Sequence, residues 1–248
     1  MGKYLTMAKA VIKESDILLL LLDARYMQES RNPEVEDRVR SYKKPLIYVI
    51  TKSDLADRER LERIKKSVKP YVFFSAKEHY GGKRLREMII MTAEKQLGKK
   101  DDIVVGVLGY PNVGKSSLIN MLKGRHSAST SILSGHTKAL QKIRVGERIM
   151  LIDTPGVIPQ KDKGGLKNII MGAVDYSKVS DPERAVVSLM NRFPGRIESH
   201  FCVPAGEDKR ETIAGIALKK HMLKKGGLPD TRRAATAILM DLQKDRIK

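Results

Sequence analysis

One segment near the middle of the chain constrains the fold more than any other feature. It reads Gly109-Tyr110-Pro111-Asn112-Val113-Gly114-Lys115-Ser116-Ser117 and fits GxxxxGK[ST], the pattern of a phosphate-binding loop. The apolar run Ile103–Leu108 precedes it, and a stretch with helical spacing of Leu118, Ile119 and Leu122 follows it. Because the pattern requires a strand before it and a helix after it, we predict a phosphate site here.

The residue types of this segment suit phosphate chemistry. Glycines let successive backbone N–H groups turn toward phosphate oxygens, and the helix N-terminus adds the positive end of its dipole. Lys115 is expected to reach the β- and γ-phosphates, and the Ser116 hydroxyl to ligate Mg²⁺. The predicted nucleotide ligands in the loop are Asn112, Val113, Gly114, Lys115, Ser116 and Ser117.

A DxxG motif lies downstream, where the apolar run Ile149–Asp153 continues into Thr154-Pro155-Gly156. Alone, this motif could be an ordinary turn. After a phosphate loop, it predicts that Asp153 holds Mg²⁺ through water and that the Gly156 N–H senses the γ-phosphate. Thr137, between the two motifs, is the candidate switch threonine that completes the Mg²⁺ ligands. Lys115, Thr137 and Gly156 are therefore expected to act in catalysis.

Two segments upstream of the phosphate loop predict the base. Thr51-Lys52-Ser53-Asp54 comes after an apolar run, and the Asp54 carboxylate can accept from both N1–H and the 2-amino group of guanine, which adenine does not offer. The Lys52 stem can lie against the base plane, and the Ala76 N–H of Ser75-Ala76-Lys77 can meet the guanine O6. Together with the phosphate loop, these segments predict a guanine nucleotide. The expected ligands are Thr51, Lys52, Asp54, Ser75, Ala76 and Lys77.

The remaining pattern predicts an α/β fold with a mostly parallel sheet and helices on both faces, because short apolar runs alternate with helix-periodic stretches. The predicted strands are Ile17–Asp23, Leu46–Thr51, Tyr71–Ser75, Ile103–Leu108, Lys142–Val145 and Ile149–Asp153, and the helices between them are Arg58–Ser67 and Lys83–Leu97. Beyond about residue 175 only helices are predicted, over Pro182–Asn191, Asp208–Lys225 and Thr231–Lys244. We expect an α/β domain over residues 1–175 and a small all-α domain over 176–248.

The charge of the chain indicates a polyanionic partner. Lys and Arg number 48 against 29 acidic residues, a formal net charge of +19. Such an excess is typical of nucleic-acid-binding proteins. The alternative is a Lys-rich solvated surface of the kind found in thermophilic proteins. In such a surface the number of Glu residues should rise alongside Lys, whereas here the acidic residues lag behind. The candidate RNA-binding residues lie in the helical domain, although each could also belong to a solvated helix face; they are Lys219, Lys220, Lys224, Lys225, Arg232 and Arg233.

Cysteine content and hydropathy bear on the compartment. The single cysteine, Cys202, excludes an internal disulfide framework and fits a reducing environment. No apolar run reaches the roughly 18 residues that a membrane span needs, and Met1-Gly2-Lys3-Tyr4 lacks a secretory pattern. We expect a cytoplasmic protein without a membrane partner.

The motif order resembles the circularly permuted YlqF/YawG-type GTPases, which act in assembly of the large ribosomal subunit. Here TKSD and SAK precede the phosphate loop, whereas ordinary GTPases place them after DxxG. The chain also has segments that look like the N- and C-terminal signatures of this family, namely Met7-Ala8-Lys9-Ala10, Leu22-Asp23-Ala24-Arg25, Ser30-Arg31-Asn32-Pro33 and Gly226-Gly227-Leu228-Pro229-Asp230.

The resemblance implies a circularly permuted P-loop GTPase domain with the helical domain after it. It implies hydrolysis of GTP to GDP and phosphate at a low intrinsic rate, in a switch that acts on the precursor of the large ribosomal subunit through rRNA; we expect a monomer. The alternative is a GTP-gated RNA-binding or trafficking module with negligible hydrolysis.

Three positions modify these expectations. Thr51 stands where GTPases usually have Asn, and a hydroxyl cannot supply an amide's donor and acceptor together, so guanine affinity is expected to be weaker. Val157 occupies the place of the water-orienting Gln of Ras-like enzymes, so hydrolysis is expected to need help, such as the ribosomal particle. Asn112 matches the residue that ligates K⁺ in related potassium-stimulated GTPases, which gives it an expected catalytic role; a plain turn Asn is the alternative.

Overall fold

The computed structural model describes residues 3–123, 141–153 and 165–247. The chain divides into two compact units, residues 1–161 and 162–248. This division lies earlier than the one expected at residue 175. The reason is local: Gln243 Nε2 donates to the carbonyls of Ile169 (3.1 Å) and Val174 (2.8 Å), which ties this stretch to the last helix of the chain.

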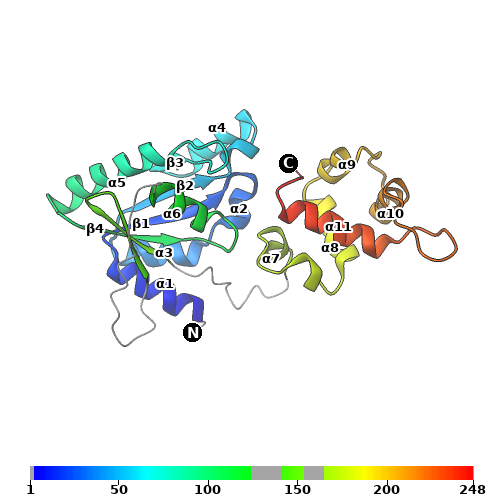
Figure 1. The fold of residues 1–248 in the computed structure, drawn as a ribbon, viewed down its shortest axis with the longest axis horizontal. Helices are drawn as coiled ribbons and strands as arrows, with labels where there is room; N and C mark the ends of the chain where they lie inside the picture. Colours follow the sequence, from blue (N-terminus) through cyan, green and yellow to red (C-terminus); the bar gives the residue numbers. More distant parts are fainter. Residues whose placement is uncertain (1–2, 124–140, 154–164, 248) are drawn as a thin grey trace. The chain divides into compact units, whose positions relative to one another are not determined.

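The first unit contains a six-stranded sheet in the order β3-β2-β1-β4-β6-β5 (Figure 1). Strand β1 pairs in parallel with β2 and β4, β2 with β3, and β4 with β6, while β5 runs antiparallel to β6. The mostly parallel sheet is thereby confirmed. The strands are β1 (Ile17–Asp23), β2 (Leu46–Thr51), β3 (Tyr71–Phe73), β4 (Ile103–Leu108), β5 (Gln141–Val145) and β6 (Ile149–Asp153).

The sheet order brings the motifs together. Strand β4, which leads into the phosphate loop, lies between β1 and β6, so the strands that precede the loop form one half of the sheet. Strands β1, β2, β3, β4 and β6 are parallel, and their carboxyl ends therefore meet at one edge. Ligands of open α/β sheets bind at this edge.

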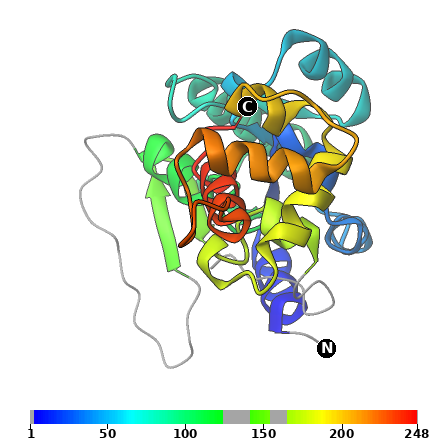
Figure 2. The ribbon, with the colours of Figure 1, turned by 90° about the vertical axis from the view of Figure 1, so that its right-hand side faces the viewer.

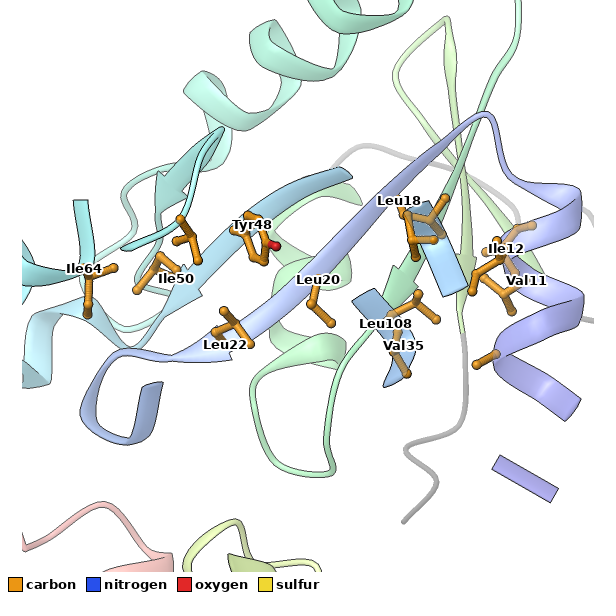
Figure 3. Close-up of a cluster of buried hydrophobic side chains, with 14 of the residues drawn as sticks. Val11, Ile12, Leu18, Leu20, Leu22, Val35, Tyr48, Ile50, Ile64 and Leu108 are labelled. Atoms are coloured by element: carbon orange, nitrogen blue, oxygen red, sulfur yellow. The ribbon is translucent and has the colours of Figure 1, made fainter. Parts of the chain in front are cut away.

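Helices cover both faces of the sheet. On one face, α1 (Lys3–Glu14) and α3 (Pro33–Ser41) pack on β1, whose seven residues are all buried. Figure 3 shows this cluster, in which Val11, Ile12 and Val35 meet the strand side chains; its other labelled members are Leu18, Leu20, Leu22, Tyr48, Ile50, Ile64 and Leu108. Side chains alternate along a strand, so Leu19 and Leu21 face the other way, and Figure 1 shows α5 (Gly82–Leu97) on that side. Each such fully buried side chain contributes about 2 kcal/mol.

Short elements complete the first unit. They are the 3₁₀ helices η1 (Ala24–Tyr26) and η2 (Ser53–Leu55) and the α-helices α2 (Met27–Ser30), α4 (Arg58–Ser67) and α6 (Lys115–Lys123). Helix α4 has the predicted bounds, whereas α1, α2 and α3 were not predicted. Helix α3 begins where Asn32 Oδ1 accepts a hydrogen bond from the Val35 N–H (3.4 Å) and Pro33 takes the first helical position.

The second unit is helical. In Figure 2, α8 (yellow), α10 (orange) and α11 (red) pack against one another. Aspartates cap these helices: Asp181, Asp208 and Asp230 each accept a hydrogen bond from a backbone N–H of the first turn. The elements are α7 (Leu166–Ile170), η4 (Tyr176–Lys178), α8 (Pro182–Arg192), α9 (Arg196–Phe201), α10 (Lys209–Lys219) and α11 (Thr231–Gln243).

The helix predicted over Asp208–Lys225 is wrong at its C-terminal end, because α10 ends at Lys219. The chain then reverses in a tight turn. Leu223 pairs with Pro229 in an isolated antiparallel β-bridge, and the Lys224 N–H donates to Leu228 O (2.8 Å). Gly226 and Gly227 have φ of 89° and 77°, which glycine adopts readily. None of the described helices has the length and apolar character needed to cross a membrane.

Candidate nucleotide-binding site

The phosphate loop joins β4 to α6 in the predicted strand–loop–helix context. Gly109 has φ 155°, and a Cβ there would lie 2.9 Å from Val113 Cγ2 and 3.1 Å from Leu21 O. Lys115 is 7% exposed, and its Nζ donates to the carbonyls of Gly109 (2.9 Å) and Tyr110 (2.5 Å). The loop therefore closes around the lysine ammonium, next to the N-terminus of α6, where a phosphate group is favoured.

Other residues of the loop lie at its surface. Asn112, Ser116 and Ser117 are exposed, Val113 is buried and Gly114 is partly buried. Asn112 has φ 58°, in the left-handed region that Asn tolerates better than most residues. This conformation supports the interpretation of Asn112 as a turn residue and leaves its side chain exposed.

The first base-reading segment lies against the phosphate loop. A Cβ on Gly114 would lie 3.8 Å from Thr51 Cβ, so the two segments adjoin although they are far apart in the sequence. Thr51 is buried, and its hydroxyl donates to Leu22 O (3.1 Å). A threonine hydroxyl has one proton to donate, and in Thr51 that proton is taken up by the hydrogen bond to Leu22 at the end of the neighbouring strand.

The second base-reading segment is tied to the first. The Ser53 hydroxyl donates to Phe74 O (3.0 Å) and lies 2.7 Å from Tyr80 Oη. Ser75 is fully buried, and its backbone pairs with Tyr80 in an isolated bridge, which is why β3 ends before the predicted Ser75. Asp54 and Ala76 are partly exposed and Lys77 is exposed. Thus 51–54 and 74–76 form one structure at the sheet edge.

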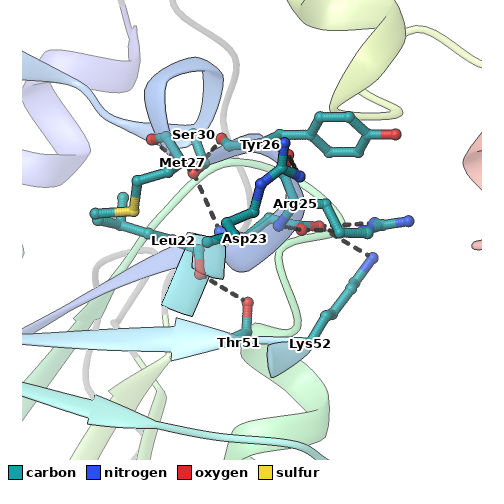
Figure 4. Close-up of polar contacts among 9 residues, drawn as sticks. Leu22, Asp23, Arg25, Tyr26, Met27, Ser30, Thr51 and Lys52 are labelled. Carbon is teal, nitrogen blue, oxygen red and sulfur yellow. Dashed lines mark hydrogen bonds and ion pairs between the residues drawn. The ribbon is translucent and has the colours of Figure 1, made fainter. Parts of the chain in front are cut away.

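An unpredicted cluster lies at the end of β1 (Figure 4). Asp23 is 1% exposed, and its carboxylate accepts hydrogen bonds from Arg25 and lies 3.5 Å from Lys52 Nζ. Burial by itself raises the pKa of Asp23, but the hydrogen bonds and charge of Arg25 and the charge of Lys52 outweigh it and leave the pKa below its ordinary value. In the sequence this segment stands out only as part of the family signature; the available signal is an acid at the end of a buried strand with an arginine two residues later.

The predicted Mg²⁺ ligands are only partly described. Ser116 lies in the first turn of α6, whereas Thr137 and Gly156, as well as Val157, lie outside the described residues, as does the Asp153 side chain. Register pairs Gly106 of β4 with Ile152 of β6, which brings the Asp153 backbone to the sheet edge that carries the phosphate loop. Hydroxyl and carboxylate oxygens are the donors that Mg²⁺ prefers, so this set fits the ion. Among the described residues, no cluster of three His, Cys, Asp or Glu side chains forms another metal site.

The candidate RNA-binding residues all have exposed side chains in the second unit. Lys219 ends α10 and its Nζ donates to Cys202 O (2.8 Å), while Lys220 Nζ lies 5.6 Å from the centre of the Phe201 ring. Lys224 and Lys225 lie on the turn before α11, and Arg232 and Arg233 lie in its first turn.

Comparison with known proteins places this site in a family context. The model of the family described as "50S ribosome-binding GTPase" matches residues 104–192. A GTP-binding protein of Methanocaldococcus jannaschii is 40% identical over 242 residues, which cover 96% of this chain and 64% of the relative. Nucleolar GTP-binding protein 2 of Saccharomyces cerevisiae is 31% identical over 247 residues, which cover 96% of this chain and 50% of the relative. The chain thus spans between half and two thirds of the length of these relatives.

Solved structures agree in fold. GDP-bound YlqF from T. maritima superposes with a TM-score of 0.68 at 21% identity, over 96% of this chain and 94% of that one. GNP-bound YlqF gives 0.66 at 22% identity, over 99% and 95%. The six-stranded order derived above, with the base-reading strands ahead of the phosphate loop, is the permuted arrangement. The chain therefore has the fold of the circularly permuted P-loop GTPases, and its sequence relatives are GTP-binding proteins.

Proposed function

We propose that the chain binds GTP and GDP with Mg²⁺, hydrolyses GTP slowly in the cytoplasm, and acts as a nucleotide-dependent switch on the precursor of the large ribosomal subunit. One observation carries the proposal: the phosphate loop around Lys115 adjoins Thr51 and the segment that ends in Asp54. Phosphate and base ligands then lie at one sheet edge, as a nucleotide requires.

The proposed ligands divide by chemistry. Lys115 and the loop backbone would hold the phosphates, and Asp54 would accept from the guanine edge. The ion would be held by Ser116, Thr137 and Asp153 and would neutralise charge on the phosphates.

Hydrolysis in this proposal depends on charge supplied from outside the described site. Asn112 is exposed beside the phosphate loop, where a bound K⁺ would add positive charge in the transition state. A ribosomal particle is the other proposed source of stimulation.

The proposed partner is rRNA, bound by a monomer. The net charge of +19 favours a polyanion, and the six basic candidates of the second unit are exposed. The relatives named nucleolar GTP-binding proteins are consistent with a ribosomal setting.

The test is steady-state GTP hydrolysis with and without purified large-subunit particles, in K⁺ and in Na⁺ buffers of equal ionic strength. We expect particles to raise the rate at least about tenfold, which is about 1.4 kcal/mol of transition-state stabilisation. A K⁺ requirement that disappears in Asn112→Ala would support the role of Asn112. If GTP binds but neither particles nor K⁺ change the rate, the chain is a nucleotide-gated binding module instead.

A further inference from the structure

The end of β1 holds a buried carboxylate beside the base-reading lysine. Register pairs Asp23 with Thr51, so the side chain of Asp23 lies one residue from Lys52 across the parallel strands. Asp23 and Arg25 are 1% and 4% exposed, while the Lys52 side chain is 21% exposed. Figure 4 shows the contacts among these three side chains.

Arg25 fixes the orientation of this carboxylate. Asp23 Oδ1 accepts from the Arg25 N–H (2.9 Å) and Nε (3.0 Å), and Oδ2 accepts from Nη2 (2.8 Å). The turn is anchored on both sides, since the Asp23 N–H donates to Ser30 Oγ (3.1 Å) and Arg60 Nη1 donates to Arg25 O (2.9 Å). Such a bidentate pair sets the plane of the carboxylate as well as its position.

The same carboxylate meets Lys52. Oδ2 lies 3.5 Å from Lys52 Nζ, and Lys52 has φ 51°, a left-handed conformation that is uncommon outside glycine. A lysine stem is flexible, and an ion pair at its tip limits the rotamers that it samples. The buried charge of Asp23 therefore restrains the residue that would lie along the base.

We infer that Asp23, oriented by Arg25, is a positioning residue that holds Lys52 in place to receive a purine base. This inference rests on the proposed nucleotide site. Asp23 is too buried to contact a nucleotide itself and would act through Lys52. Because Lys52 would touch the face of the base and Asp54 its edge, loss of Asp23 should weaken binding of different purine nucleotides by the same factor.

The test is a double-mutant cycle on the full chain, read as affinity for fluorescent GDP and IDP. Asp23→Asn keeps the size of the side chain and removes its charge. We expect it to weaken both nucleotides by about tenfold with their affinity ratio unchanged. In a Lys52→Met background the same change should have less than about a twofold effect, since the interaction that it removes is already gone.

The matched control is Glu36→Gln. Glu36 is also fully buried and paired with an arginine, Arg31, and it accepts a hydrogen bond from Tyr48, but it lies in α3. The Glu36→Gln substitution should lower the midpoint of thermal unfolding and leave GDP affinity unchanged. This control therefore separates an effect on stability from an effect on the position of Lys52.

The outcomes are distinct. If the wild-type chain does not bind GDP, the proposed function fails. If it binds GDP and Asp23→Asn matches the wild type, or weakens binding equally in the Lys52→Met background, the positioning role is overturned. If Asp23→Asn does not fold, Lys52→Arg, which can still reach Asp23, should bind GDP better than Lys52→Met; equal affinities would overturn the inference.

Discussion

Two buried carboxylates of the first unit are held ionised by arginines, and the two pairs lie in different parts of the unit. Asp23 pairs with Arg25 at the sheet edge, and Glu36 pairs with Arg31 on α3. Burial raises the pKa of Glu36, but hydrogen bonds from Arg31 and Tyr48 outweigh it and leave the pKa below its ordinary value. Removing one partner of such a pair costs about 3–5 kcal/mol, because it leaves a buried charge unpaired.

Tyr48 makes stability at high pH a test of this arrangement. Burial, and then the hydrogen bond to Glu36, raises the pKa of Tyr48 from 10.0 to about 12. A group whose pKa is raised by folding stabilises the fold fully below its unfolded pKa, and this contribution is lost as pH rises through the folded pKa. We expect wild type to exceed Tyr48→Phe in unfolding free energy by about 2 kcal/mol near pH 8 and by progressively less from about pH 10 to 12. Urea unfolding would measure this; a difference constant with pH would contradict it.

At the residue scale, the sequence predicts the motif residues but not the side chains that contact and position them. Lys115 and Asp54 are each predicted from the spacing of residues within their own short segment, because the ligands of each segment are close together in the sequence. The role of Asp23 depends on β1 and β2 being adjacent in the sheet, and that of Ser53 on contact with Phe74 and Tyr80. Such contacts between segments are fixed by the fold and carry no local pattern.

At the element scale, buried strands were the most predictable parts. The predicted bounds of β1, β2, β4 and β6 agree with the structure because each is a continuous apolar run that ends at a polar residue or a glycine. Helices α7 and α9 are too short to show a helical period. The overlong helix before the Gly226-Gly227 turn shows the opposite error, since helix-compatible residues continued past the point where the chain reverses.

The start of α5 depends on one glycine. Gly81 has φ 91°, and a Cβ there would lie 2.2 Å from Phe73 O, whereas Gly98 at the other end has φ 75° with open space around it. We expect Gly98→Ala to cost about 1–2 kcal/mol from the left-handed conformation alone, and Gly81→Ala to cost more. Chemical denaturation of both variants measures the difference, which isolates the clash with the end of β3. Equal losses would show that the backbone shifts there at no cost.

At the scale of the whole molecule, the order of the motifs decides which part of the chain follows Gly156, the residue proposed to contact the γ-phosphate. In this chain the segment after Gly156 leads into the helical unit. We propose that γ-phosphate contacts of Thr137 and Gly156 alter the helices of that unit. Hydrogen exchange in residues 176–248 should then differ between the GTP-analogue and GDP states. Identical protection in both states would contradict this coupling.

The central claim is that the sheet edge binds a guanine nucleotide, and the most direct measurement is competition between GDP and ADP for the full chain in Mg²⁺. Asp54 would accept two hydrogen bonds that adenine does not donate, so we expect ADP to bind at least about a hundredfold more weakly. Asp54→Ala should abolish most of this discrimination, while Glu36→Gln should preserve it. Equal affinities for GDP and ADP, or no binding of GDP, would contradict the account.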